Sequence, residues 1–271
     1  MKYLHFLSAM ALPGLVAAPA MGAEPLVSNA KWVVDFGKAH CIATRNYGTA
    51  AAPIFLAFKP SPIGDVMQVS VLRGSGKKGI DQYDGTIAAG EAPPLRVSML
   101  GYPGKSGKMR IVSINLSLDD FKPVRTASVL RFRSAGELNR AFALTQMAPV
   151  AAALDDCVAG LRTAWHIGDE KGELSQPARS QKPLRDYFGS NDYPAVAVYG
   201  LASGTVGMVT LIDEAGKLES CMVTQTSGNA SLDAQSCAIV TERAKFDPAL
   251  GSDGKPAKSG TTLRIRWQLG N

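Results

Sequence analysis

The four cysteines are the residues of this 271-residue chain whose chemistry depends most on the surrounding compartment. In an oxidising compartment an even number of cysteines indicates disulfides, and four cysteines can pair in three ways. Cys221 and Cys237 lie near each other in one C-terminal stretch, whereas Cys41 and Cys157 bracket an N-terminal stretch. We therefore predict the disulfides Cys41–Cys157 and Cys221–Cys237. A metal site is not expected, because the sequence has no CxxC pair and few histidines.

No set of residues with the spacing of a catalytic centre is found in the sequence. Ser203 lies in the stretch GLASG, which does not match the GxSxG turn of a nucleophilic serine. Gly104-Lys105-Ser106 lacks the first glycine of a phosphate-binding loop, because Met99 stands at that position. Two pairs of adjacent acids do not face each other on a helix and are interpreted as solvated charges, namely Asp119-Asp120 and Asp155-Asp156. We therefore expect neither an enzyme nor a cofactor.

Residues 1–23 have the pattern of a secretory signal peptide. Lys2 precedes an apolar stretch from Leu4 to Ala18, and small residues follow up to Ala23. The apolar stretch contains Pro13-Gly14 and is too short for a comfortable membrane span of about 20 residues. We expect cleavage near Ala23 and export to a bacterial periplasm. An uncleaved inner-membrane anchor is the alternative.

The composition indicates an ordinary globular protein with a mild cationic bias. Hydrophobic residues make up 46% and charged residues 19% of the chain, so a core can form without metal or cofactor. The formal net charge is +6, but the basic residues are scattered rather than clustered with aromatics, as a nucleic-acid surface requires. We expect no nucleic-acid partner. Anionic surroundings such as peptidoglycan fit the charge.

Residues 24–167 are predicted to form an N-terminal, mostly-β module closed by a helix. Alternating Trp32, Val34 and Phe36 indicate a strand, and further strand patterns cover residues 54–58, 66–72, 95–100 and 109–118. Apolar residues recur at helical spacing from Val150 to Trp165 and include Cys157. Residues 168–183 are polar and contain Gly and Pro, so we interpret them as a linker.

Residues 184–271 are predicted to form a second, small α+β domain. Residues 206–212 and 218–224 have strand patterns around a turn at Asp213–Lys217 and indicate a hairpin. A helix is expected over residues 232–245 with Ser231 as its N-cap, followed by a strand at 261–269. The order β-β-α-β predicts an antiparallel three-stranded sheet.

The last strand raises the question of what lies beside it. Leu263, Ile265, Trp267 and Leu269 alternate with polar residues, so one face is expected to be buried. A long exposed edge strand attracts other chains unless it is protected. Either Arg264 and Arg266 discourage unwanted pairing there, or a partner docks.

Several short motifs of this second domain occur in the order found in a known bacterial family. Together they resemble the C-terminal domain of TonB, the bacterial energy transducer, over about a third of the chain. The matching residues are Asp192-Tyr193-Pro194-Ala195, Gly204-Thr205-Val206, Asp213, Gly216, Ser227-Gly228, Leu232-Asp233, Phe246-Asp247-Pro248-Ala249 and Gly254-Lys255-Pro256. Cysteines placed like Cys221 and Cys237 look like a variant of this domain.

The resemblance implies docking of an outer-membrane receptor segment by β-strand addition, in support of energy-dependent transport. The expected partner-binding residues are Leu263, Arg264, Ile265, Arg266, Trp267, Gln268 and Leu269, with Tyr193 and Pro194. A strand-paired homodimer is conceivable at the same edge. The N-terminal segment departs from TonB, since Leu12 follows Ser8 where the motor-engaging pattern has His, and no long Pro-rich spacer is found. The alternative is therefore a soluble periplasmic binding or scaffold protein without motor coupling.

Overall fold

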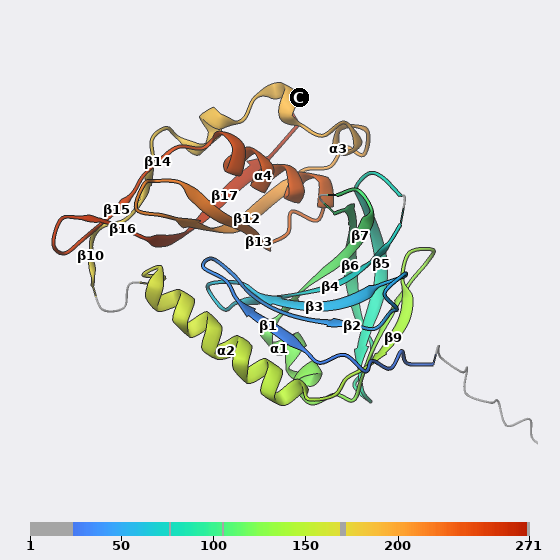
Figure 1. Cartoon of the computed structure of the whole chain (residues 1–271). Helices are drawn as coiled ribbons and strands as arrows, with labels where there is room; N and C mark the ends of the chain where they lie inside the picture. The colour runs from blue at the N-terminus through green and yellow to red at the C-terminus, as the bar shows by residue number, and fades with distance from the viewer. Residues whose placement is uncertain (1–23, 76, 105, 169–171, 270–271) are drawn as a thin grey trace, which may run out of the picture.

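The computed structural model describes residues 24–75, 77–104, 106–168 and 172–269, and its fold is α+β. The predicted signal peptide, residues 1–23, lies outside these ranges. A large curled sheet is formed by N-terminal residues, and a smaller sheet with its helix, formed by C-terminal residues, lies above it (Figure 1). None of the helices in the described ranges is both long and apolar enough to cross a membrane.

The N-terminal module is an antiparallel sheet of nine strands within the described residues, in the order β1-β2-β3-β4-β7-β6-β5-β8-β9. The strands predicted around Trp32–Phe36 and at residues 54–58, 66–72, 95–100 and 109–118 are confirmed, whereas four further strands were not predicted. The bounds are β1 Val33–Phe36, β2 Cys41–Asn46, β3 Ile54–Pro60, β4 Val66–Gly74, β5 Asp81–Ala89, β6 Leu95–Pro103, β7 Met109–Ser117, β8 Val129–Ser134 and β9 Asn139–Ala143.

The sheet curls until its two ends are tied together. Leu26, which precedes β1, donates its N–H to the carbonyl of Ala141 in β9 at 2.8 Å and accepts the N–H of Ala143 at 2.9 Å. Tyr47 adds a hydrogen bond from its hydroxyl to the Ala143 carbonyl at 2.9 Å. The interior of the curl is therefore enclosed and holds the larger apolar core of the molecule.

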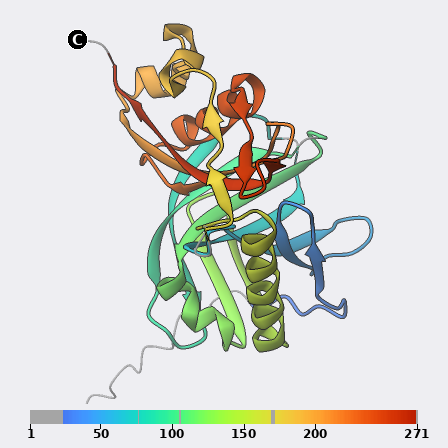
Figure 2. The ribbon, with the colours of Figure 1, turned by 90° about the vertical axis from the view of Figure 1, so that its left-hand side faces the viewer.

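Helix α2 (Met147–Ala164) closes one side of the curled sheet (Figure 2). Its buried Val150, Leu154, Cys157 and Leu161 form the predicted apolar stripe. Cys157 is bonded to Cys41 of β2, which confirms the first predicted disulfide. Because the bond closes a loop with a sequence separation of 116, a chain-entropy argument gives it roughly 5 kcal/mol of stabilisation.

A buried charge cluster ties three strand ends of this module together. The side chain of Arg110 in β7 is fully buried; its Nε donates to Glu137 Oε1 at 2.9 Å and its Nη2 to Asp81 Oδ2 at 2.5 Å. Burial raises the pKa of Glu137, but hydrogen bonds from Arg110 and Tyr83 and the charge of Arg110 outweigh it, so this pKa lies below its ordinary value. The pKa of Asp81 is likewise lowered, because hydrogen bonds from Lys77, Tyr83 and Arg110 outweigh its desolvation.

In the C-terminal module, β12 (Gly204–Ile212) lies between β13 (Leu218–Gln225) and β17 (Ser259–Trp267), and both pairings are antiparallel. Helix α4 (Ala230–Arg243) contacts β12 and β13. The helix begins at Ala230 rather than Leu232, and its N-cap is Asn229 rather than the predicted Ser231. Asn229 Oδ1 accepts the N–H groups of Ser231 and Leu232, a cap that the neighbouring serine does not provide.

The segment predicted as a linker also contributes two short strands. β10 (Leu174–Gln176) pairs with β15 (Ala249–Gly251), which pairs with β16 (Pro256–Ala257), and β11 (Arg179–Ser180) pairs with β14 (Phe246–Asp247). The remaining short helices are α1 (Leu118–Phe121), α3 (Ala195–Tyr199) and the 3-10 turns Lys122–Arg125, Leu184–Tyr187 and Ser190–Asp192.

The two modules are joined where α2 ends. Gly260 of β17 donates its N–H to the carbonyl of Trp165 at 2.8 Å, and His166 Nδ1 is hydrogen-bonded to the carbonyl of Lys258 at 2.8 Å. Leu211 of β12 is fully buried in the same apolar core as Trp165 and Ile167. The small sheet is therefore held against the large one by shared core residues and not by a linker alone.

The charge cluster makes acid stability testable. Because both carboxylates have pKa values below their unfolded values of about 4, their stabilisation is present above that pH and is lost as the pH falls through the folded pKa. Glu137→Gln should lower the free energy of unfolding at pH 7 by about 3 kcal/mol and flatten its decrease between neutral and acid pH. Urea unfolding at several pH values measures both effects. Glu91→Gln, at an exposed position, is the control, and an unchanged pH slope in Glu137→Gln would contradict this account.

Candidate functional site

The outer edge of β17 is a row of backbone groups without a neighbouring strand. In the described part of the chain β17 pairs with β12 alone, in a continuous register from Gly204↔Trp267 to Ile212↔Ser259. In an antiparallel pair, residues alternately point their N–H and C=O groups toward the partner strand and away from it. Every second residue of β17 therefore presents its backbone groups on the side opposite β12.

Two hydrogen bonds tell which residues of β17 face outward. The N–H of Gly260 reaches the carbonyl of Trp165, outside the sheet, whereas the carbonyl of Thr261 accepts from Thr210 Oγ1 of β12 at 3.2 Å. Because the register has no bulge, the backbone groups of Thr262, Arg264 and Arg266 point away from β12, as those of Gly260 do. Their N–H and C=O groups form the free edge. The backbone groups of Ile265 point toward β12, so its amide belongs to the hydrogen-bond ladder between the two strands.

A groove of about 400 Å³ runs beside this edge. The strand supplies one wall, with Arg264, Ile265, Arg266 and Trp267, and Gln268 continues it. The segment that follows β11 supplies the opposite wall, and its apolar lining residues are Leu184, Phe188 and Tyr193. Open backbone groups and an apolar trough thus lie side by side.

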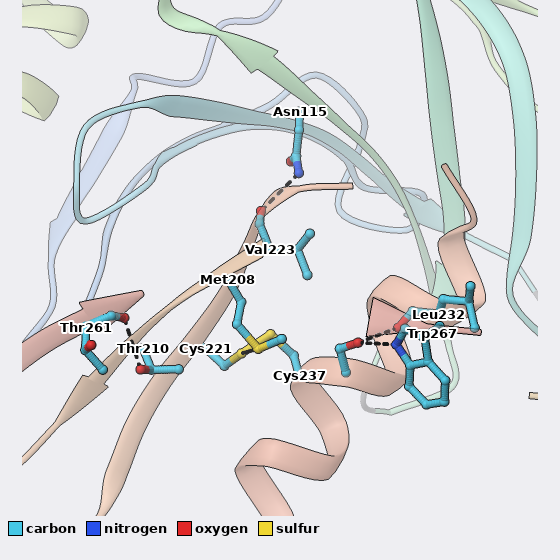
Figure 3. The surroundings of a disulfide bond; sticks show 10 residues. Asn115, Met208, Thr210, Cys221, Val223, Leu232, Cys237, Thr261 and Trp267 are labelled. Carbon is cyan, nitrogen blue, oxygen red and sulfur yellow. Dashed lines mark hydrogen bonds between the residues drawn. A yellow bond between two sulfur atoms is a disulfide. The ribbon is translucent and has the colours of Figure 1, made fainter. Parts of the chain in front are cut away.

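Trp267 is fixed in place at the end of the groove. Its Nε1 donates to Ser236 Oγ of α4 at 2.8 Å, and the hydroxyl of Ser236 in turn donates to the carbonyl of Leu232 (Figure 3). Phe188 and Tyr193 meet the indole edge-on, with ring centroids 5.5 Å and 5.1 Å away. The indole is 6% exposed, so it closes the floor of the groove rather than projecting from it.

The opposite wall is held to α4 by a forked ion pair. Arg243 Nη1 donates to Asp192 Oδ2 at 2.7 Å and Nη2 donates to Asp192 Oδ1 at 2.8 Å. The hydrogen bond from Arg243, with a further one from the N–H of Gly189, holds the pKa of Asp192 below its ordinary value. Tyr193, the next residue, donates its hydroxyl to the carbonyl of Ala202. The aromatic wall is therefore positioned before any partner arrives.

The two arginines of β17 lie on the face away from α4. Arg264 is exposed and donates from Nη2 to Gln225 Oε1 of β13 at 2.9 Å, above Gly207 of the central strand. A side chain at position 207 would meet Gln225 Cβ at 2.8 Å, so the glycine makes room for this contact. Arg266 is exposed as well. The guanidinium of Arg264 is therefore turned toward β13, whereas Arg266 is a second exposed arginine that lines the groove.

The structure brings most of the predicted partner-binding residues to this edge. Leu263, Ile265 and Trp267 face the small core, with Leu263 partly exposed, whereas Gln268 and Leu269 follow the end of β17. Pro194 is the N-cap of α3 and lies outside the groove lining. Leu184 and Phe188 were not predicted, because they stand in an irregular segment where apolar residues have no period to reveal them.

The second predicted disulfide is confirmed: Cys221 of β13 is bonded to Cys237 of α4 (Figure 3). It fixes the helix that carries Ser236 to the sheet that carries the free edge. No group of three or more His, Cys, Asp or Glu side chains that could hold a metal ion is found in the described residues. The arrangement is suited to binding an extended chain.

Comparison with known families agrees with the geometry. Residues 190–269 match the family described as Gram-negative bacterial TonB protein C-terminal. This range contains α3, the three strands of the small sheet and α4, together with the Asp192–Arg243 pair. A search of curated proteins found no match to the chain.

Tyr193 tests how the groove wall is held. Tyr193→Phe removes only the hydrogen bond to Ala202 and should lower the free energy of unfolding by about 1 kcal/mol. Tyr193→Ala also removes the ring from Trp267 and should lower it by about 3 kcal/mol. Denaturant unfolding followed by circular dichroism gives both values. Tyr199→Ala, at a residue that is 89% exposed, should change stability by less than about 0.5 kcal/mol. Equal effects of the two Tyr193 variants would show that ring packing does not hold the wall.

Proposed function

Because residues 190–269 belong to the TonB C-terminal domain family, we propose that this protein docks an extended segment of an outer-membrane receptor along the free edge of β17. The docked segment adds a strand to the small sheet, with main-chain hydrogen bonds to Thr262, Arg264 and Arg266. This docking supports energy-dependent transport across the outer membrane. The observation that carries the proposal is that the backbone N–H and C=O groups of these three residues point away from β12, beside a preformed groove.

The side chains beside the edge define which segment fits. On the α4 side of the sheet, an added strand lies against Ile265, Trp267 and the aromatic wall, so its residues facing that way are apolar. On the other side it lies beside Arg264 and Arg266, so acidic residues are favoured there. The preferred partner segment alternates apolar and acidic residues over about five positions, at the two-residue period of a strand.

A periplasmic location follows from the same proposal. The disulfides Cys41–Cys157 and Cys221–Cys237 form in oxidising compartments and are uncommon in the cytosol. An exported protein with a receptor-docking edge meets its partner at the inner surface of the outer membrane.

The backbone of Arg264 offers the sharpest test of docking. Its amide faces away from β12, so Arg264→Pro removes an outward donor and leaves the internal ladder intact. Arg264→Ala removes the side chain and keeps the amide. Affinity for synthetic peptides from the N-terminal segments of TonB-dependent receptors, measured by calorimetry, should fall at least about tenfold for Arg264→Pro and about threefold for Arg264→Ala.

Controls separate an unfolded variant from a blocked edge. Each variant is checked for an unchanged unfolding midpoint. A peptide that is N-methylated at alternate amides removes the same main-chain hydrogen bonds from the partner's side. If Arg264→Pro and the methylated peptide bind as well as their parents, strand addition at β17 is wrong. Light scattering adds a further outcome: a dimer that Arg264→Pro abolishes would show that the edge pairs with a second copy instead.

Export is testable by mass spectrometry of the native protein. A protein recovered from the periplasmic fraction should begin near Ala23 or Glu24, because small residues precede that point. An intact Met1 terminus in the membrane fraction would show instead that the protein is anchored in the inner membrane. Either terminus is compatible with docking at β17, so this measurement decides location independently of the peptide experiment.

A further inference from the structure

A second cavity, of about 680 Å³, lies between the two modules on the β13 side of the small sheet. Its volume falls in the range of small-molecule sites, which are typically about 300–1,000 Å³. One wall is the large sheet at β6 and β7, and the other is formed by β13 and α4. It shares none of its lining residues with the groove at β17.

The large sheet opens where it borders this cavity. β6 and β7 pair only over Leu100–Pro103 and Arg110–Ser113, although β6 begins at Leu95 and β7 continues to Ser117. The two strands therefore separate at this end, and Leu95, Val97 and Leu116 line the gap. The gap provides an apolar recess beyond the surface of the sheet.

The other wall is also largely apolar and is cross-linked by a disulfide. Met222, Val223, Ala234 and the Cys221–Cys237 disulfide line it, and Figure 3 shows the disulfide and Val223. Asn115 Nδ2 of β7 donates to the carbonyl of Val223 at 3.1 Å and bridges the two walls. Gln82 adds a double link between the modules, donating to the carbonyl of Gly228 at 3.0 Å and accepting the N–H of Ala230 at 2.8 Å. The cavity is therefore preformed.

The cavity is lined by two basic and two acidic side chains, which differ in how they are paired. Its acids are engaged: Asp233 accepts from Thr226 Oγ1 and from the N–H and hydroxyl of Ser227, and Asp120 accepts from the hydroxyl of Ser117. The side chains of Lys59 and Arg96 make no hydrogen bond or ion pair to any residue within the described ranges. Burial lowers the pKa of the Lys59 ammonium below its ordinary value. Desolvating a half-buried cation that has no partner is costly, and an anion beside it would offset that cost.

We propose that this cavity binds a small amphipathic molecule with a single carboxylate and a hydrocarbon tail. The carboxylate pairs with Lys59, and the tail occupies the recess between β6 and β7, against Leu95, Val97 and Leu116. Such a site goes beyond receptor docking, since it uses the opposite edge of the small sheet and residues of the N-terminal module. It gives that module a binding role of its own.

Dodecanoate is the probe, titrated below its micelle-forming concentration into the full exported chain and followed by calorimetry. One molecule should bind per chain. Acetate, which has the head without the tail, and dodecyltrimethylammonium, which has the tail with the opposite charge, should not bind. Lys59→Met should weaken dodecanoate binding at least about tenfold, as expected for a lost charged hydrogen bond. Lys31→Met, at an exposed lysine outside the cavity, should leave the affinity unchanged.

Ala234→Trp fills the cavity from α4 and should abolish binding, and Lys59→Glu gives a second test if that variant does not fold. Absence of saturable dodecanoate binding to the wild-type chain would overturn the proposal. Equal affinity of Lys59→Met and the wild type, or equal binding of the cationic amphiphile, would overturn the assignment of the head group. None of these outcomes depends on whether receptor peptides bind at β17.

Discussion

The C-terminal sheet, as far as the chain is described, has two edge strands, and only one of them is covered by the N-terminal module. The edge strand β13 is turned toward the N-terminal module, where Asn115 bonds the carbonyl of Val223 and Gln82 holds the loop before α4. The edge strand β17 has a groove beside its C-terminal part, from Arg264 to Gln268. Since an unpaired edge invites pairing, covering one side directs any strand addition to the other. The large module therefore decides which edge of the small sheet can receive a partner.

The junction also sets where that edge begins. The carbonyl of Trp165, at the end of α2, takes the N–H of Gly260, which is the first outward donor in β17. A side chain at position 260 would lie 2.5 Å from Ile167 Cγ1, so glycine is required by the close approach of the two modules. An added strand thus cannot continue past this point, and the available length runs from Thr262 toward Gln268. The length of edge open to the proposed docking is therefore limited by Trp165, a residue outside the family-matched range 190–269.

Sequence patterns predicted those parts of the fold whose residues alternate against a core. The period of two in β17, the stripe of α2 and the pairing of the four cysteines all agree with the structure. Strand β5 was not predicted, because several of its residues are selected by contacts with neighbouring strands and do not alternate between core and solvent. Asp81 accepts a hydrogen bond from the buried Arg110, and Gly85 leaves room for the side chain of Met99. The aromatic wall of the groove escaped as well, since Phe188 lies in irregular chain and becomes meaningful only beside Trp267.

Helix α4 contacts both sites, which raises the question of whether they influence each other. Ser236 holds the indole of Trp267, and the next residue, Cys237, lines the inter-module cavity. Coupling requires two arrangements of α4 that each ligand distinguishes. The disulfide to β13, the ion pair of Arg243 with Asp192 and the cap at Asn229 all hold the helix in one arrangement. Since these three contacts hold α4 in a single arrangement, the structure favours two sites that bind their ligands independently.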